Sequence, residues 1–285
     1  MIAVINRVSD VDSKAIVDQH NVLRAAITHA ANMQKMVWDD ELAAVAQKWA
    51  DNCDFKHDDH RVIPGRFFNA GQNLARGQST WDGAMQRWFN EGRNFLHSNP
   101  SMRLEDVGHF TQMVWATSSK IGCGYQKCSN IQGNHFYVCN YGPSGNTAAD
   151  ISKPYIKHST ACSDCPGKCI TSGNHAGLCD CNGLTCYNSG TLNLTTCTCT
   201  CLQPFHKLSE DCALDCENTK DHASCGSPPF DKCESNTPDY CPHMCDHCPY
   251  GAYNYVEKDS PNETSAVTPS SLLGLLAGVM LLLRR

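Results

Sequence analysis

The sequence is poor in long apolar segments and carries no excess of positive charge. Its first fourteen residues, MIAVINRVSDVDSK, contain no apolar core of the kind found in secretory signal peptides. Lys and Arg total 23 against 29 Asp and Glu, a net charge of −6, which excludes nucleic-acid binding driven by bulk positive charge. Neither a GxSxG nor an HExxH motif occurs, so two common hydrolase arrangements are missing.

Cysteine is scarce in one part of the chain and abundant in another. Residues 1–157 contain four of the 20 cysteines, and residues 158–250 contain the other sixteen. The second density is typical of disulfide scaffolds, which form in oxidising compartments. We therefore expect an extracellular protein, secreted or anchored at the cell surface, whose export signal lies upstream of the printed sequence.

Residues 14–150 have the patterns of a mixed helix and strand domain. Residues 39–49 and 79–95 each predict an amphipathic helix that begins at a capping side chain. Residues 121–125 and 135–141 are rich in aromatic and β-branched side chains, which predicts two strands joined by a hairpin loop. This mixed order predicts an α+β fold, an αβα sandwich.

Glu91 falls inside the apolar stripe of the second predicted helix, between Trp88 and Phe95. A carboxylate that faces a core costs several kcal/mol unless it is paired or hydrogen-bonded. Two interpretations stay open at this point. We favour a pocket carboxylate, and the alternative is a side chain at the helix edge that reaches water.

Cysteine spacing divides the second part of the chain into segments 158–180, 181–212 and 216–248. We expect no free thiol, and the pairing within a segment stays open because six cysteines allow 15 connectivities. The less favoured alternative is a zinc site, since some of these cysteines and histidines have suitable spacing. Its ligands would come from Cys162, Cys165, Cys245, Cys248, His243 and His247.

Residues 260–285 combine a polar spacer with a short apolar tail, Leu272–Leu283, and two final arginines. Twelve helical residues span about 18 Å, less than the ~30 Å hydrocarbon core of a bilayer. We expect a signal for a GPI anchor, with a marginal membrane span as the alternative. Asn193 and Asn262 lie in N-x-[ST] sequons and are expected glycosylation sites.

Three segments resemble the signature motifs of the CAP superfamily, which comprises cysteine-rich secretory proteins, antigen 5 and plant pathogenesis-related 1 proteins. They are HNVLR at 20–24, GHFTQMVWATS at 108–118 and FYVCNYGPSGN at 136–146. The resemblance covers residues 14–150, the expected CAP domain. It implies an αβα sandwich, secretion, and a cleft lined by two His and two Glu.

Carried over residue by residue, the cleft consists of His57, Gln72, Glu91 and His109. Gln72 stands where the family has Glu, which removes one negative charge and one general base. The resemblance implies weak Zn²⁺ binding by the two histidines, with Glu91 as a third ligand or an orienting group. It also implies two disulfides in this domain, Cys53–Cys128 and Cys123–Cys139.

The three cysteine-rich segments resemble known modules less specifically. Residues 158–180 resemble the hinge of cysteine-rich secretory proteins, and residues 181–212 resemble a degenerate EGF-like module. Residues 216–248 resemble a ShK-type module, although residues 234–239 lack the Lys with which some ShK toxins block channels.

Together these features predict a non-enzymatic extracellular binding protein. Its cleft would take a divalent cation or a small apolar ligand such as a sterol or lipid, and its cysteine-rich segments would contact a protein partner. One alternative is a metal-dependent hydrolase or peptidase acting through a water at the two histidines. The other alternative is a toxin-like ion-channel ligand.

Overall fold

The computed structural model describes residues 8–146, 151–202, 208–233 and 240–248. The expected spacer and apolar tail at 260–285, with Asn262, and the stretch 234–239 lie outside the described residues. Within the described part, no helix is both long enough and apolar enough to cross a membrane.

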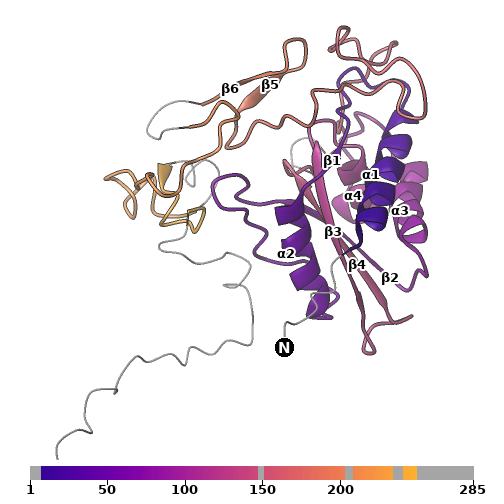
Figure 1. The fold of residues 1–285 in the computed structure, drawn as a ribbon, viewed down its shortest axis with the longest axis horizontal. Helices are drawn as coiled ribbons and strands as arrows, with labels where there is room; N and C mark the ends of the chain where they lie inside the picture. Colours follow the sequence, from indigo (N-terminus) through magenta and orange to yellow (C-terminus); the bar gives the residue numbers. More distant parts are fainter. Residues whose placement is uncertain (1–7, 147–150, 203–207, 234–239, 249–285) are drawn as a thin grey trace, which may run out of the picture.

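The N-terminal part is a three-layer αβα sandwich, as the sequence predicts (Figure 1). Its four-stranded sheet has the order β1-β3-β4-β2, where β1–β3 is parallel and the other pairs are antiparallel. Helix α2 covers one face, and α1, α3 and α4 cover the other. The strands are β1 (Val37–Trp38), β2 (Gly71–Arg76), β3 (Lys120–Lys127) and β4 (His135–Gly142). The helices are α1 (Asp10–Ala25), α2 (Asp40–Asp51), α3 (Trp81–Phe89), the short 3-10 helix η1 (Asn90–Asn94) and α4 (Leu104–Met113).

Side-chain caps fix where three of the helices begin. Ser9, Asp39 and Thr80 each accept a backbone N–H of the first turn of α1, α2 and α3. Such a bond satisfies one of the amide groups that lack a partner inside the helix. Acidic residues in each first turn add a favourable interaction with the helix dipole.

The second predicted helix is shorter than expected. It ends at Phe89 rather than Phe95, and the chain continues as η1 through Asn-Glu-Gly-Arg-Asn. Asn and Gly are poor helix formers, and a short 3-10 turn is the usual form of such a segment. Gly92 also lies against the Phe110 ring, where a Cβ would come within 2.6 Å of it. Contact with α4 therefore replaces continuation of α3, and Glu91 lies in η1.

A buried cation holds one end of the sandwich together. Arg24 of α1 is fully buried, and its guanidinium donates only to backbone carbonyls. The acceptors are Gln34, Met113, Trp115 and Ala116, at 2.6–3.2 Å. Five such donors suit a planar guanidinium, whereas Lys offers three. The last residue of the HNVLR motif thus links α1 to the segments that flank α4.

The outer edge of β3 is covered by a side chain rather than by a strand. Strand β1 pairs with only the first two residues of β3. Further along, Gln47 of α2 accepts the N–H of Tyr125 at 3.1 Å and donates to its carbonyl at 2.8 Å. The amide of Gln47 therefore makes the two bonds that a neighbouring strand would make.

All twenty cysteines are paired, and none is free. Cys53–Cys128 joins the end of α2 to the end of β3, and Cys123–Cys139 joins directly opposite residues of β3 and β4. These are the two pairs that the family resemblance implies. The other eight disulfides stay within the segments defined by spacing. They are Cys162–Cys169, Cys165–Cys179, Cys181–Cys197, Cys186–Cys199, Cys201–Cys212, Cys216–Cys248, Cys225–Cys241 and Cys233–Cys245.

The zinc alternative for these segments is wrong. Cys162, Cys165 and Cys179 lie close together, but each is in a disulfide, and so are Cys245 and Cys248. Zinc binds the thiolate, which a disulfide sulfur cannot supply.

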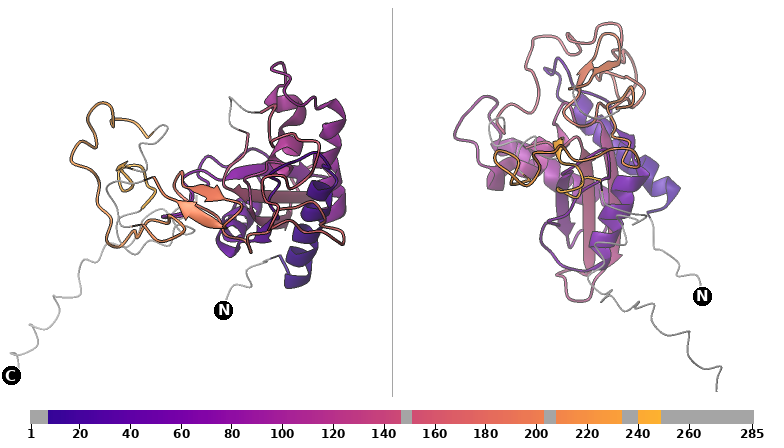
Figure 2. Two further views of the ribbon diagram at one scale, coloured as in Figure 1. Left: turned by 90° about the horizontal axis from the view of Figure 1, so that it is seen from above. Right: turned by 90° about the vertical axis from the view of Figure 1, so that its left-hand side faces the viewer.

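The cysteine-rich segments pack against the loop between α2 and β2. Gly65 donates to the carbonyl of His247 and accepts from Leu214 and Asn188. Its φ of +71° and a backbone oxygen 2.6 Å from the place of a Cβ leave room for glycine only. Residues 181–201, which include β5 (Thr191–Asn193) and β6 (Thr198–Thr200), lie beside this loop, and the last segment, which contacts it through His247, extends beyond it (Figure 2).

Candidate functional site

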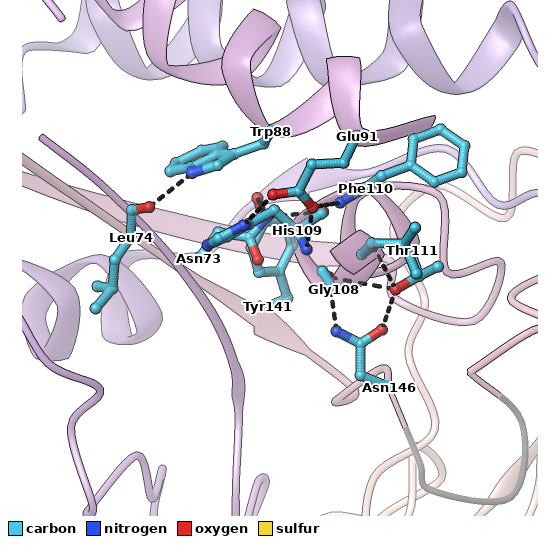
Figure 3. A network of polar contacts seen from close by, with 11 residues as sticks. Asn73, Leu74, Trp88, Glu91, Gly108, His109, Phe110, Thr111, Tyr141 and Asn146 are labelled. Atoms are coloured by element: carbon cyan, nitrogen blue, oxygen red, sulfur yellow. Dashed lines mark hydrogen bonds and ion pairs between the residues drawn. The ribbon is translucent and has the colours of Figure 1, made fainter. Parts of the chain in front are cut away.

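The first half of the predicted cleft is formed by η1 and α4. Glu91 accepts three hydrogen bonds, from Nδ1 of His109 at 2.7 Å and from the backbone N–H groups of His109 and Phe110 at 2.9 and 3.3 Å (Figure 3). The His109 side chain is 35% exposed, so solvent reaches its ring. Glu91 is thus a part-buried carboxylate bonded to His109.

The second half lies between the loop before β2 and the sheet itself. Oε1 of Gln72 accepts from Nδ1 of His57 at 2.9 Å and from the Asp58 N–H at 3.1 Å. Its Nε2 donates to Oδ1 of Asn140 on β4 at 3.0 Å. The Asp58 N–H can only donate, which fixes Oε1 on this side of the amide. Nδ1 of His57 therefore carries the proton.

The two histidines have the same arrangement. In each ring Nδ1 donates to an oxygen of a fixed side chain, Gln72 for His57 and Glu91 for His109. In a neutral ring held this way, the remaining nitrogen, Nε2, carries the lone pair. It is the atom that a metal ion binds. Burial of the His57 ring lowers its pKa, the hydrogen bond to Gln72 opposes this shift, and the nearby Arg61 and His109 add to it. His57 is therefore neutral at pH 7.

Buried side chains pack against the cleft residues and hold them in place. Trp88 lies nearly parallel to the His109 ring at 6.3 Å between centroids and donates to the carbonyl of Leu74 (Figure 3). Asn73, next to Gln72 on β2, donates to the carbonyl of His109. Adjacent residues of one strand thus hold both halves of the cleft, which sets their separation.

The structure places the four predicted cleft residues on four different segments. Gln72 and Glu91 orient the rings, and their hydrogen-bonded oxygens face the histidine Nδ1 atoms. Sequence reasoning missed Asn140 and Asn73, the residues that fix Gln72 and His109. Asn140 lies in the FYVCNYG motif, and Asn73 directly follows Gln72. No spacing in the sequence distinguishes an asparagine that will be buried in a strand.

Comparison with known proteins identifies the family. Residues 17–141 match the CAP profile, described as the cysteine-rich secretory protein family. A cysteine-rich venom protein of Conus textile is 36% identical over 255 residues, which cover 82% of this chain and 79% of that protein. The chain belongs to the CAP family.

Two further relatives extend the comparison. Cysteine-rich secretory protein 2 of Cavia porcellus is 39% identical to this CAP protein over 162 residues, which cover 54% of this chain and 64% of that protein. A crystal structure titled "NaASP2 with Zn2+" has a TM-score of 0.49 and 28% identity over 61% of this chain and 98% of its own.

Family membership agrees with the architecture and the cysteine chemistry. The αβα sandwich is confirmed, and the matched profile spans the described part from α1 to β4. Ten disulfides and relatives named as secretory and venom proteins indicate an extracellular CAP protein. The EGF-like and ShK-type assignments of the later segments stay predictions.

Proposed function

We propose that this CAP protein is a non-enzymatic extracellular binding protein whose cleft takes a divalent cation through Nε2 of His57 and His109. The observation that carries the proposal is the bond from Nδ1 of each ring to a fixed side-chain oxygen, which in a neutral imidazole leaves the lone pair on Nε2. Glu91 and Gln72 do not bind the ion in this proposal. They orient the two imidazole rings.

The residues present suit Zn²⁺ or a similar ion, but they make a weak site. Two neutral imidazoles supply two of the four ligands that tetrahedral zinc requires, and water or a bound partner has to supply the others. When bound, zinc would supply a positive charge that attracts an anionic or carbonyl group of a ligand. All cysteines are in disulfides, so no thiolate is available here as a nucleophile.

The test is calorimetric titration of Zn²⁺ into the purified protein at pH 7.5. We expect weak binding with one ion per chain, and His57→Ala and His109→Ala each to lower the affinity at least about tenfold through loss of a ligand. His29→Ala is the matched control, because His29 is an exposed histidine on another loop. Equal zinc affinity in all four proteins would place any bound ion elsewhere.

We further propose that the cysteine-rich segments contact an extracellular protein and that a lipid anchor holds the chain at the cell surface. A sterol or other lipid is the second ligand class that the family implies for the CAP domain. Phosphatidylinositol-specific phospholipase C should release the protein from intact cells. Retention after that treatment, with Arg284 detected by mass spectrometry, would favour a spanning segment instead.

A further inference from the structure

A cavity of about 630 Å³ lies between the CAP sandwich and residues 185–195, which follow the first cysteine-rich segment (158–180). Its floor includes the loop 66–69 and the residues just after β4, and its opposite wall is the segment 185–195. This volume lies within the ~300–1,000 Å³ of small-molecule sites. The cavity is separate from the histidine cleft, since none of the four cleft residues contributes to its lining.

The lining carries many uncharged groups that both donate and accept hydrogen bonds. Amide side chains come from Asn32 and Asn69, and hydroxyl groups come from Thr117 and Ser144, beside two charged side chains, Arg66 and Asp164. An aromatic ring, Phe68, lies among them. Sugars present the matching combination, because their hydroxyls donate and accept while their C–H faces are apolar.

One wall of this cavity is itself a glycosylation sequon. The residues from Thr191 to Thr195 all line the cavity, and they contain Asn193-Leu194-Thr195. Asn193 is exposed, and its Oδ1 accepts the backbone N–H groups of Thr195 and Thr196 at 2.9 and 3.1 Å. No hydrogen bond of its Nδ2 occurs within the described part of the chain. The nitrogen that receives a glycan is thus free while the amide is held in place.

We propose that an N-linked glycan on Asn193 lies across this cavity, with its first sugars against the amide and hydroxyl groups of the lining. In the attachment step, Nδ2 forms a bond to C1 of the first N-acetylglucosamine and loses a proton. The bond from C1 to the diphosphate of the lipid-linked donor breaks, and the lipid diphosphate leaves. The occupant of the cavity is therefore covalently attached to one wall.

This placement gives the glycan a structural effect. The wall at 185–195 contacts the sandwich through Thr185, whose Oγ1 lies 2.7 Å from Oγ of Ser119, and through Tyr187, which bonds Arg66 at 2.6 Å. Sugars that contact both the wall and the floor add interactions across the same junction. They also exclude other ligands from the cavity.

The test compares two neighbouring substitutions in protein secreted from eukaryotic cells. Thr195→Ala destroys the sequon, whereas Thr196→Ala leaves it intact, and both residues are exposed threonines whose backbone N–H bonds Asn193. Intact mass should show a glycan at Asn193 in the wild type and in Thr196→Ala only. Amide hydrogen exchange over residues 66–69 and 143–146 should then be at least about threefold slower in these two proteins than in Thr195→Ala.

Enzymatic trimming separates a packed glycan from one that only promotes folding. Cleavage of the native glycoprotein to a single N-acetylglucosamine, after folding is complete, should speed exchange in the same peptides. An unmodified Asn193 in the wild type would overturn the proposal. So would equal exchange in Thr195→Ala, Thr196→Ala and trimmed protein, because the glycan would then project into solvent.

Discussion

Gln72 and Glu91 hold the two cleft histidines in the same way but with different charge. Each presents an oxygen to Nδ1, so the bond does not involve Nε2. A carboxylate raises the basicity of the imidazole it bonds, and a neutral amide does so less. The two nitrogen ligands of this CAP protein are therefore unequal, with His57 the weaker one.

Restoring the charge should strengthen the site. In Gln72→Glu, the carboxylate can still accept from Nδ1 of His57 and from the Asp58 N–H, so the pKa of His57 should rise and zinc affinity should increase. At ~4 Å and an effective dielectric of ~20, one added charge contributes at most about 4 kcal/mol before desolvation. Calorimetry with Zn²⁺ and an NMR titration of His57 measure both effects.

One contact works against this gain. Glu at position 72 cannot make the hydrogen bond that Nε2 of Gln72 donates to Oδ1 of Asn140. Two oxygen acceptors then lie next to each other, which is unfavourable. The control Asn140→Asp in the Gln72 protein adds the same charge without a bond to His57, so it should tighten zinc binding less than Gln72→Glu does. A Gln72→Glu protein with unchanged zinc affinity and unchanged His57 pKa would contradict the orienting role of residue 72.

His20 of the HNVLR motif predicts an acid limit to stability. It is fully buried between the Ile16 carbonyl and the Tyr141 hydroxyl, and burial lowers its pKa to about 4. An unfolded His titrates near 6.5, so the unfolded chain takes up the proton first as the pH falls. The stabilisation is present above pH 6.5 and is lost towards pH 4, by about 2–3 kcal/mol between pH 7.5 and 4.5.

Urea unfolding at these two pH values measures the effect. His20→Gln should lose about 2–3 kcal/mol less than the wild type over the same interval, because Gln does not titrate. Acidic groups contribute equally to both proteins and cancel in the comparison. The same pH dependence in both proteins would mean that His20 is already protonated in the fold.

At the scale of elements, local pattern predicted α2, the start of α3 and the β3–β4 pair, but not α4, β1 or β2. The helix α2 and the β3–β4 pair follow from capping and from aromatic and β-branched runs, with the ends in error by a few residues. Strand β2 was missed, because GQNLAR has neither alternation nor a β-branched residue. It forms through pairing with β4, a contact distant in sequence. The end of α3 was missed for a similar reason, since Phe110 of α4 decides it.

The two CAP-domain disulfides should differ in their contribution to stability. Cys53–Cys128 spans 75 residues of sequence, and Cys123–Cys139 spans 16. Loop-closure entropy predicts that the longer loop stabilises by about 1.4 kcal/mol more. The double variants Cys53→Ala/Cys128→Ala and Cys123→Ala/Cys139→Ala each keep the other nine pairs intact. Urea midpoints in the reverse order would show that packing in the sheet outweighs chain entropy.

At the scale of the whole molecule, Arg66 joins the sandwich to the cysteine-rich segments. It bonds Asp39 at 2.5 Å, Glu41, and the Tyr187 hydroxyl, and it lies over the Tyr187 ring at 4.7 Å. One bonded carboxylate is the cap of α2, so the same charge serves a helix end and the junction. No sequence pattern signals this role, because its partners are 25 to 121 residues away.

Loss of this charge should loosen the junction without unfolding either side. In Arg66→Gln we expect amide exchange over residues 185–190 to speed up by at least about fivefold, since a part-buried carboxylate and a phenol lose a shared partner. Arg76→Gln is the matched control, because Arg76 lies over Phe55 on the CAP surface. Equal exchange rates in the two variants would mean that the backbone hydrogen bonds of Gly65 alone hold the junction together.

The amide of Gln47 has a consequence for how these molecules behave at high concentration. An uncovered strand edge is a template on which a second chain can pair and start an aggregate. Because Gln47 already engages both polar groups of Tyr125, a second copy arriving at the β3 edge finds no free pair of bonds there. One side chain on α2 thus opposes sheet extension when many copies of the protein are close together.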